Sequence, residues 1–375
     1  MRRVCADRSA AQDPVIDFDP SEEQQLIVDT VRQFARNEVR PRARECDEAA
    51  KLPAELLHEA HALGLVANGI DERFGGGGAR SAVTGALVAE ELAWGDLSIA
   101  AAILSPSLES VPVSDLASDA QKQRWLPGLV GERFRPGALA LVESHYGADP
   151  LVPRTRARRD GAGYVLDGEK CLVPWLEGGE SVLVSATGDT GPQLFRVSRQ
   201  AMGLRAAPAR YMGIQALPTV ELTLASVRVA GDDALPAARD GVASVVQRGR
   251  VAQGAMAIGV ARAAYEVARD YAKERQAFGA PIATKQAIAF KLADMAIEID
   301  AARLLLWEAA WHLDSGRDAA RAVFLAYRQA QRVALEVSDA AVQVLGGHGY
   351  TREYLPELCL RNARGFACFE GLSLV

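Results

Sequence analysis

Long uncharged hydrophobic runs are missing from this sequence. Nowhere do about eighteen apolar residues follow one another without a charge, which is the length that a membrane-spanning helix needs. The two arginines near the start are not followed by the apolar segment of a secretion signal. From these two absences we expect a soluble, cytoplasmic protein.

Cysteine pairs and metal-binding motifs are also missing. His58 and His61 stand three residues apart on a predicted helix, but no third ligand is in register, so a surface helix is the favoured interpretation and no metal is predicted. The cysteines are too scattered for a disulfide framework or a Cys-x-x-Cys zinc site, and we expect reduced, mostly buried thiols. They are Cys5, Cys46, Cys171, Cys359 and Cys368.

Basic residues do not outnumber acidic ones. The formal net charge is −6 and the isoelectric point is about 5.6, whereas a protein that binds nucleic acid needs a basic surface to neutralise phosphates. The sequence also lacks a P-loop, a Gly-x-Ser-x-Gly elbow, a His-Glu-x-x-His motif and the Gly-x-Gly-x-x-Gly turn of a dinucleotide-binding sheet. These absences argue against nucleic acid as a partner and against those classes of enzyme.

The pattern of apolar residues changes twice along the chain. Residues 1–136 show helical patterns, which begin at Ser21 as a candidate cap. In residues 137–235 glycine and proline recur and apolar residues alternate, as in PTVELTLASVRV, which predicts short strands in a small β-barrel domain. Residues 236–375 are helical again. The predicted fold class is α+β, mainly α, with a helical domain, a β-barrel domain and a C-terminal four-helix bundle.

The clearest helix of the last domain lies between Thr284, which we expect to cap it, and Gly316, which we expect to end it. Two further long helices flank it, at 242 to about 273 and at 319–345, and a shorter one follows, as a bundle requires. Apolar residues recur along the central helix at steps of four and three, the seam of a bundle helix. They are Ile288, Leu292, Met295, Ile299, Ala302, Leu306, Ala309 and Leu313.

Two stretches of this domain carry groups that suit a ligand. In ERQAFGAPIATKQ, Arg275 precedes a tight turn at Gly279, and a guanidinium beside a glycine suits a phosphate or pyrophosphate. Taken alone, an ion pair at a helix end is the simpler explanation of that arginine. In AVQVLGGHGYTREY, Gly346 and Gly347 give the backbone freedom either to approach a flat ligand or merely to end a helix.

The ordered set of motifs resembles the acyl-CoA dehydrogenase family of flavoproteins over nearly the whole chain. The N-terminal matches are VRQFARNEVRPRARECDE, AEELAWGD and LPGLVGE. The family's Arg-x-x-Phe-Gly turn is matched by Arg275, Phe278 and Gly279, and its Gly-Gly-x-Gly-Tyr-Thr-x-Glu-Tyr run by residues 346–354. Its terminal aromatic-Glu-Gly is matched by Phe369, Glu370 and Gly371.

The resemblance implies an enzyme that binds FAD across a subunit interface of a homo- or hetero-oligomer, typically a tetramer. It would oxidise an acyl thioester, carried by CoA or by an acyl carrier protein, to the α,β-enoyl form and pass electrons to an electron-transferring flavoprotein. The residues that would contact the FAD of a neighbouring subunit are Arg275, Phe278 and Gln286 near the pyrophosphate, and Gln343, Gly346 and Gly347 on the adenosine side. Arg250 and Phe369 would lie at the substrate.

Glu370 would be the catalytic base in this scheme. The α-proton of a thioester is too weakly acidic for a carboxylate in water, so the enzyme must desolvate the base and stabilise the developing enolate. A carboxylate beside Phe369 in an apolar pocket has such surroundings, because desolvation raises its pKa. Gly249, where some members of the family place the base, offers no alternative.

The chain also departs from the family pattern around the flavin. The segment LVESHYGAD stands in place of the usual Thr-Glu-Pro to Gly-Ser-Asp run, so Val142 replaces a flavin-bonding hydroxyl. Pro174 removes both a hydroxyl and a backbone N–H that would face the flavin, and Leu372 replaces a threonine after the Glu-Gly. The other replacements are Ser144, Ala148, Leu172 and Val173.

Three interpretations follow. The favoured one is a working dehydrogenase of a divergent branch, in which Trp175 and backbone groups replace the missing flavin contacts. The second is a half-site subunit of a heteromeric dehydrogenase, which supplies Arg275 and its neighbours to a partner's FAD. The third, a purely structural helical scaffold, accounts for the bundle but not for the motifs. Acyl chain length and the electron acceptor are left open by the sequence.

Overall fold

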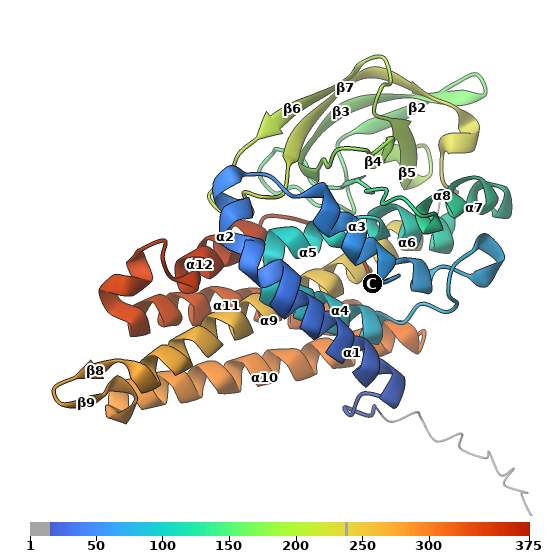
Figure 1. The fold of residues 1–375 in the computed structure, drawn as a ribbon. Helices are drawn as coiled ribbons and strands as arrows, with labels where there is room; N and C mark the ends of the chain where they lie inside the picture. The colour runs from blue at the N-terminus through green and yellow to red at the C-terminus, as the bar shows by residue number, and fades with distance from the viewer. Residues whose placement is uncertain (1–15, 237–238) are drawn as a thin grey trace, which may run out of the picture.

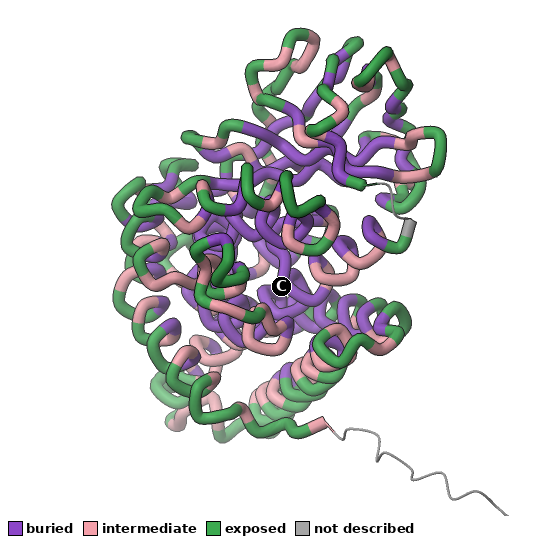
Figure 2. The backbone as a smooth tube through the Cα atoms, turned by 90° about the vertical axis from the view of Figure 1, so that its right-hand side faces the viewer, coloured by how far each residue is buried: buried purple, intermediate pink, exposed green. Residues whose placement is uncertain are grey.

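The computed structural model describes residues 16–236 and 239–375 (Figure 1). Cys5 lies outside this range. A mixed sheet lies against one side of a large helical body, and Figure 2 shows buried residues inside that body and along the strands of the sheet. The helical bundle expected from the sequence is present, and the expected order of helices, then strands, then helices is confirmed.

The N-terminal helices begin where the sequence predicts. The Ser21 hydroxyl accepts a hydrogen bond from the Gln24 amide at 3.2 Å, and the Gln24 side chain accepts one from the Ser21 amide at 2.9 Å, so the two form a capping box. A π-helical turn at Ala35–Val39 joins the first two helices. The helices are α1 (Glu22–Phe34), α2 (Arg40–Ala49), α3 (Ala54–Ala62), α4 (Ala82–Gly95), α5 (Leu97–Ile103), α6 (Ser107–Leu116), α7 (Asp119–Trp125) and α8 (Pro127–Val130).

The strands form one seven-stranded sheet rather than the closed barrel that we expected. Its order is β1-β4-β2-β3-β7-β6, with β5 on β4, and β1 and β2 each run parallel to β4. Among the described strands β6 pairs only with β7, and β1 and β5 pair only with β4, so the sheet keeps open edges and the barrel is not confirmed. The strands are β1 (Leu139–Ala140), β2 (Arg156–Asp160), β3 (Gly163–Pro174), β4 (Ser181–Gly188), β5 (Gly191–Ser198), β6 (Leu204–Ala209) and β7 (Thr219–Val229).

The C-terminal helices pack as a bundle along α9. The helices are α9 (Arg239–Glu274), α10 (Gln286–Asp314), α11 (Ala320–Leu345) and α12 (Leu355–Phe366). A small hairpin of β8 (Gln276–Ala277) and β9 (Ala280–Pro281) joins α9 to α10. Five of the predicted seam residues of α10 are fully buried: Met295, Ile299, Ala302, Leu306 and Ala309.

The predicted cap of α10 is wrong by one residue, because the helix begins at Gln286 with Lys285 as its N-cap. Thr284 ends a short 3-10 turn and donates a hydrogen bond to the Pro281 carbonyl at 2.7 Å, so its hydroxyl is not available to cap α10. Gly316 follows the helix in the left-handed region, at φ +64°, as its expected role requires.

Close contact and charge fix α4 against the bundle. A side-chain carbon at Gly259 of α9 would lie 2.3 Å from the Glu90 carbonyl of α4, so only glycine allows the approach. Arg262 of α9 binds Glu90 at 2.9 Å and Glu91 at 2.6 Å, and Arg303 of α10 binds Glu90 at 3.0 Å. These ion pairs tie three helices together.

In the described ranges, no single helix is both long and apolar enough to cross a membrane. The bent pair α5 and α6 meets the length and composition criteria, and most of its residues are buried inside the fold.

Candidate active site

Glu370 lies in the loop after α12, where it meets Arg250 of α9. The Arg250 side chain donates twice to one carboxylate oxygen of Glu370, from Nε at 3.1 Å and from Nη2 at 2.8 Å, and both bonds end on Oε1. The other oxygen, Oε2, is buried and has no hydrogen-bond partner among the described residues. The two residues that the sequence assigned to catalysis and to the substrate are therefore in direct contact.

The environment of Glu370 makes its carboxylate more basic. Burial raises the pKa of Glu370, because removal of water disfavours the charged form. The Arg250 guanidinium opposes this shift by stabilising the carboxylate, and the negative charge of Asp149 adds to it, so the net direction is upward. The result is a carboxylate with one oxygen held and one oxygen left free to take a proton.

The backbone around Glu370 is clamped by two buried side chains. Gln253 of α9 donates to the Phe369 carbonyl at 3.0 Å and accepts from the Gly371 amide at 3.3 Å. The Tyr327 hydroxyl of α11 donates to the same Phe369 carbonyl at 3.3 Å. Gly371 has φ +78°, which favours glycine and turns the chain sharply after the acid.

Gln253 and Tyr327 were missed by the sequence reasoning. Gln253 follows Arg250 by three residues on one helix, so the two share a face, and this spacing could have identified it. No sequence spacing identifies Tyr327, because it contacts Phe369 from a position 42 residues away in the chain. Phe369 itself is buried and packs edge-on against Tyr211, with 6.1 Å between the ring centroids.

The sheet supplies the other wall of this site. Leu139 and Leu141, at and just after β1, lie beside Gly371: a carbon added to that glycine would lie 3.3 Å from Leu139 Cδ2 and 3.5 Å from Leu141 Cδ1. Val142 follows directly, and its carbonyl accepts a hydrogen bond from the Cys171 amide at 3.0 Å. The segment with the departures from the family pattern thus begins directly after a residue that contacts the Glu370 loop.

The ring of Trp175 is covered by the side chain of Arg199. The Arg199 guanidinium lies 3.9 Å from the centroid of the Trp175 ring, a cation–π distance, and burial lowers the pKa of Arg199 to about 10. Leu172 has φ +57°, an unusual conformation for a leucine, at a break in the register of β3 and β7.

A second candidate site is an open groove of about 530 Å³ at the far end of the bundle. Arg275, Gly346 and Gly347, three of the predicted cofactor residues, line it together with Tyr271 and His348. Gly346 has φ +59°, and side-chain carbons at both glycines would meet no other atom within 4 Å, so a flat ligand could lie against the backbone there.

The remaining predicted cofactor residues are exposed around this groove and do not line it. Phe278, at the tip of the β8–β9 hairpin, is 97% exposed. Gln286 begins α10, and Gln343 lies in the last turn of α11; both are exposed. The groove fits part of a dinucleotide cofactor. The guanidinium of Arg275 suits a phosphate group, and the exposed ring of Phe278 and the unobstructed backbone at the two glycines suit the flat parts of a nucleotide.

The two sites lie far apart within one chain. Arg250 and Arg275 are separated by twenty-five residues of almost continuous helix, which is about 37 Å at the rise of an α-helix. Figure 1 shows the hairpin β8–β9 at one end of α9 and α10, well away from the marked end of the chain. One extended dinucleotide does not cover this distance.

Comparison with known proteins defines the class of this protein. Residues 21–133 match the model of the acyl-CoA dehydrogenase N-terminal domain, and residues 241–375 match that of its C-terminal domain. The chain is 34% identical to a probable acyl-CoA dehydrogenase of Bacillus subtilis over 96% of this chain and 97% of that protein. The chain therefore belongs to the acyl-CoA dehydrogenase family, whose members are FAD-dependent oxidoreductases.

Solved structures agree with this assignment. The butyryl-CoA dehydrogenase of Megasphaera elsdenii superposes with a TM-score of 0.87 at 30% identity, over 95% of this chain and 96% of that one. A glutaryl-CoA dehydrogenase of Mycobacterium smegmatis in complex with FADH2 gives 0.86 at 29% identity, over 94% and 92%.

Proposed function

We propose that this protein oxidises an acyl thioester to the trans-2-enoyl thioester, with Glu370 as the base that removes the α-proton. The observation that carries the proposal is the state of the Glu370 carboxylate: Oε1 is held by Arg250, while Oε2 is buried and unpaired. A buried carboxylate oxygen without a donor is costly unless something meets it. The Cα–H of a bound thioester would do so.

The chain's own residues supply the conditions for this proton transfer. Burial makes Glu370 a stronger base than a glutamate in water, and the fixed Phe369 and Gly371 backbone aims it. The Glu370 backbone N–H can donate to the thioester oxygen as negative charge develops there, as such hydrogen bonds stabilise an enolate. FAD, when bound, supplies the acceptor for the hydride that leaves Cβ.

Arg250 is proposed to position the base and to set its proton affinity. Its two hydrogen bonds fix one carboxylate oxygen, so rotation of the side chain is restricted and Oε2 keeps one direction. Its charge also opposes the rise in the pKa of Glu370 that burial causes.

We further propose that the groove at Arg275, Gly346 and Gly347 holds part of the FAD of another subunit. The separation of about 37 Å along α9 supports this, because the groove is too distant to serve the flavin beside Glu370 of the same chain. Apolar side chains exposed on the outer face of the bundle support self-assembly. They are Phe290, Ile297, Leu304 and Leu305 on α10 and Phe324 and Leu325 on α11.

The half-site subunit is the second candidate, and two observations favour it. Trp175, which we expected to take over a missing flavin contact, has its ring stacked against Arg199, and Pro174 lies in β3 opposite Thr219 with no N–H to offer. A subunit of this kind would lend its groove to the FAD of a related partner chain and would not bleach flavin alone.

The visible spectrum of the purified chain tests both candidates. We expect bound yellow flavin that is bleached when a saturated acyl-CoA is added without oxygen. Glu370→Gln should retain flavin and abolish bleaching, whereas Glu59→Gln, at an exposed site on α3, should change neither. A colourless protein that gains flavin only when a homologous chain is co-expressed would favour the half-site subunit, and undiminished bleaching by Glu370→Gln would exclude Glu370 as the base.

The electron acceptor and the thioester carrier belong to the same proposal. An electron-transferring flavoprotein is the acceptor that the family assignment favours, and CoA is favoured over an acyl carrier protein as the thioester carrier. Reoxidation of the bleached protein by that flavoprotein, compared with reoxidation by oxygen, distinguishes a dehydrogenase from an oxidase.

A further inference from the structure

The four residues after Gly371 turn inward from Glu370 and run through the helical core. Leu372, Ser373, Leu374 and Val375, hereafter the 372–375 segment, are each at most 5% exposed. Two glycines leave room for it: a side-chain carbon at Gly85 of α4 would lie 2.9 Å from Val375 Cβ, and one at Gly249 of α9 would lie 3.2 Å from Leu374 Cδ2. The segment thus fills a passage that begins beside the catalytic acid.

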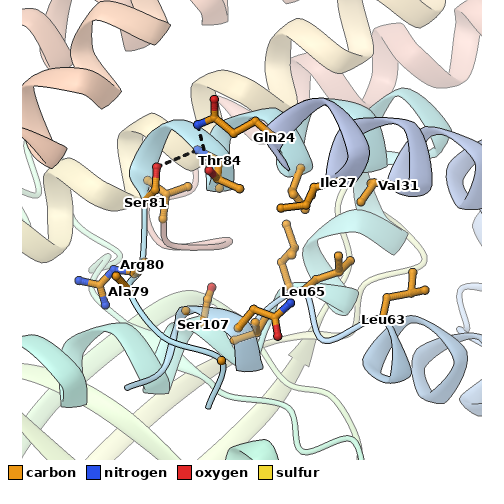
Figure 3. A pocket seen from close by; sticks show the side chains of 18 of the residues that line it. Gln24, Ile27, Val31, Leu63, Leu65, Ala79, Arg80, Ser81, Thr84 and Ser107 are labelled. Carbon is orange, nitrogen blue, oxygen red and sulfur yellow. Dashed lines mark hydrogen bonds between the residues drawn. The ribbon is translucent and has the colours of Figure 1, made fainter. Parts of the chain in front are cut away.

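This passage ends in a cavity of about 850 Å³ (Figure 3). Ser373, Leu374 and Val375 line the cavity from the side of the passage, and the helices α1, α4 and α6 supply most of the other walls. In Figure 3, apolar side chains gather on one side of the opening: Ile27, Val31, Leu63 and Leu65. The volume falls in the range of about 300 to 1,000 Å³ that is usual for small-molecule sites.

Only a few polar contacts retain the segment. Within the described ranges, three hydrogen bonds tie it to the helices: the Leu374 amide donates to Ser107 Oγ at 2.9 Å, Ser107 and Ser373 pair their hydroxyls at 3.3 Å, and Arg248 Nη1 donates to the Val375 carbonyl at 3.0 Å. Gly371, with φ +78°, turns the chain at the start of the segment. The remaining contacts are apolar and non-directional.

We infer that the 372–375 segment and a long acyl chain compete for this passage, and that the cavity receives the distal part of a long-chain fatty acyl thioester. The inference rests on the proposed function, because it places the reacting carbons of the thioester at Glu370. Four extended residues span at most about 13 Å, which corresponds to roughly ten carbons of a zigzag alkyl chain. A butyryl group is much shorter than this span, whereas a hexadecanoyl group is long enough to fill the passage and reach the cavity.

The segment and an acyl chain would bury similar amounts of apolar surface in this passage. The segment buries the side chains of Leu372, Leu374 and Val375, and an alkyl chain in the same place buries a similar apolar surface without bringing peptide groups into the core. The protein keeps a filled passage in either state, so neither water nor an empty tunnel lies beside Glu370. A short acyl group would therefore leave the 372–375 segment in the passage, whereas a long acyl group would replace it there.

The first test is direct binding of hexadecanoyl-CoA and butyryl-CoA to the flavin-loaded protein by calorimetry. Ile27→Trp narrows the cavity and should weaken hexadecanoyl-CoA binding about tenfold or more while leaving butyryl-CoA binding within about twofold. Gln33→Trp, at an exposed site on the same helix, is the matched control and should change neither. Equal weakening of both ligands by Ile27→Trp, or no weakening of either, would overturn the inference.

The second test follows the segment itself by hydrogen exchange. Addition of hexadecanoyl-CoA should increase exchange at the amides of residues 372–375, and butyryl-CoA should not. Ser107→Ala, which removes the hydroxyl that holds Leu374, should strengthen hexadecanoyl-CoA binding several-fold by loosening the segment. Unchanged exchange in the presence of bound hexadecanoyl-CoA would show that the chain takes another route.

Neither test requires turnover, so the two proposals can fail separately. If no thioester bleaches the flavin but the length-dependent binding and exchange are observed, the proposed chemistry is wrong and the passage is real. If butyryl-CoA bleaches the flavin and hexadecanoyl-CoA does not bind, the chemistry stands and the assignment to long chains falls.

Discussion

Arg250 holds one oxygen of Glu370 and leaves the other free. Both of its hydrogen bonds end on Oε1, at 3.1 and 2.8 Å, while Oε2 is buried without a partner. An arginine that gripped both oxygens would lower the pKa of the acid and block its approach to a substrate. The one-sided contact instead combines orientation with basicity.

The pH profile of kcat/KM should reflect this arrangement. Because burial raises the pKa of Glu370, the acid limb should lie above the pKa usual for a glutamate, with activity lost as the pH falls through the raised value. Arg250→Gln removes the charge that stabilises the carboxylate, so the limb should move to higher pH. Arg332→Gln, on the surface of α11, should leave the limb in place; an unmoved limb in Arg250→Gln would contradict the role given to Arg250.

Gln253→Leu should loosen the loop that carries the base. The substitution leaves the Gly371 amide without its partner and removes one of two donors to the Phe369 carbonyl, at a cost of about 1–3 kcal/mol in the free energy of unfolding. Activity should fall further than this stability loss explains, because Oε2 is then no longer aimed. Tyr327→Phe removes the weaker donor, at 3.3 Å, and should have the smaller effect on both measurements.

The buried pair Glu143–Lys170 should dominate the stability of the sheet. Lys170 is fully buried, and its Nζ donates to Glu143 at 2.9 Å. Glu143→Gln removes the negative charge and leaves this buried ammonium without a counter-charge, which should cost about 3–5 kcal/mol in denaturant unfolding. The double variant Glu143→Gln with Lys170→Met should recover much of the loss, and a double variant as unstable as the single one would show that charge is not the cause.

The same pair predicts a dependence on acid. Burial alone would raise the pKa of Glu143, but hydrogen bonds from Thr155 and Lys170 outweigh it and lower the pKa to about 2 from 4.5. The stability that this group contributes is complete above pH 4.5 and is lost as the pH falls toward 2. Glu143→Gln should therefore show a smaller decrease of unfolding free energy across this interval than the unmodified protein.

Arg275→Gln should weaken FAD retention without unfolding the chain. Arg275 is exposed, so its loss should cost little stability, whereas a charge-assisted hydrogen bond to a phosphate is worth about 1.5–3 kcal/mol. The ratio of flavin to protein after gel filtration measures the effect. Lys273→Gln, a nearby exposed cation, is the control; an equal loss of flavin in both variants would indicate a general charge effect and not a specific contact.

The sequence predicted the helical parts of the fold well, because their signals are local. The four-and-three spacing in α10 reports one buried face, and five of those residues are indeed fully buried. Closure of the barrel could not be predicted in this way. Strand patterns show which faces of a strand are buried, but closure depends on which edges pair, and β1, β5 and β6 each pair with a single strand here. Thr284 failed as a cap because its hydroxyl found a nearer carbonyl, that of Pro281.

The sequence alone determined the family, through an ordered set of motifs, and it marked Glu370, Arg250 and the glycine-rich groove. Only the tertiary structure decided which oxygen of Glu370 is free, that Gln253 and Tyr327 clamp its loop, and that the 372–375 segment lies inside a passage ending in a cavity. These features arise from contacts between residues such as Ser107 and Leu374, 267 positions apart, which no local periodicity encodes.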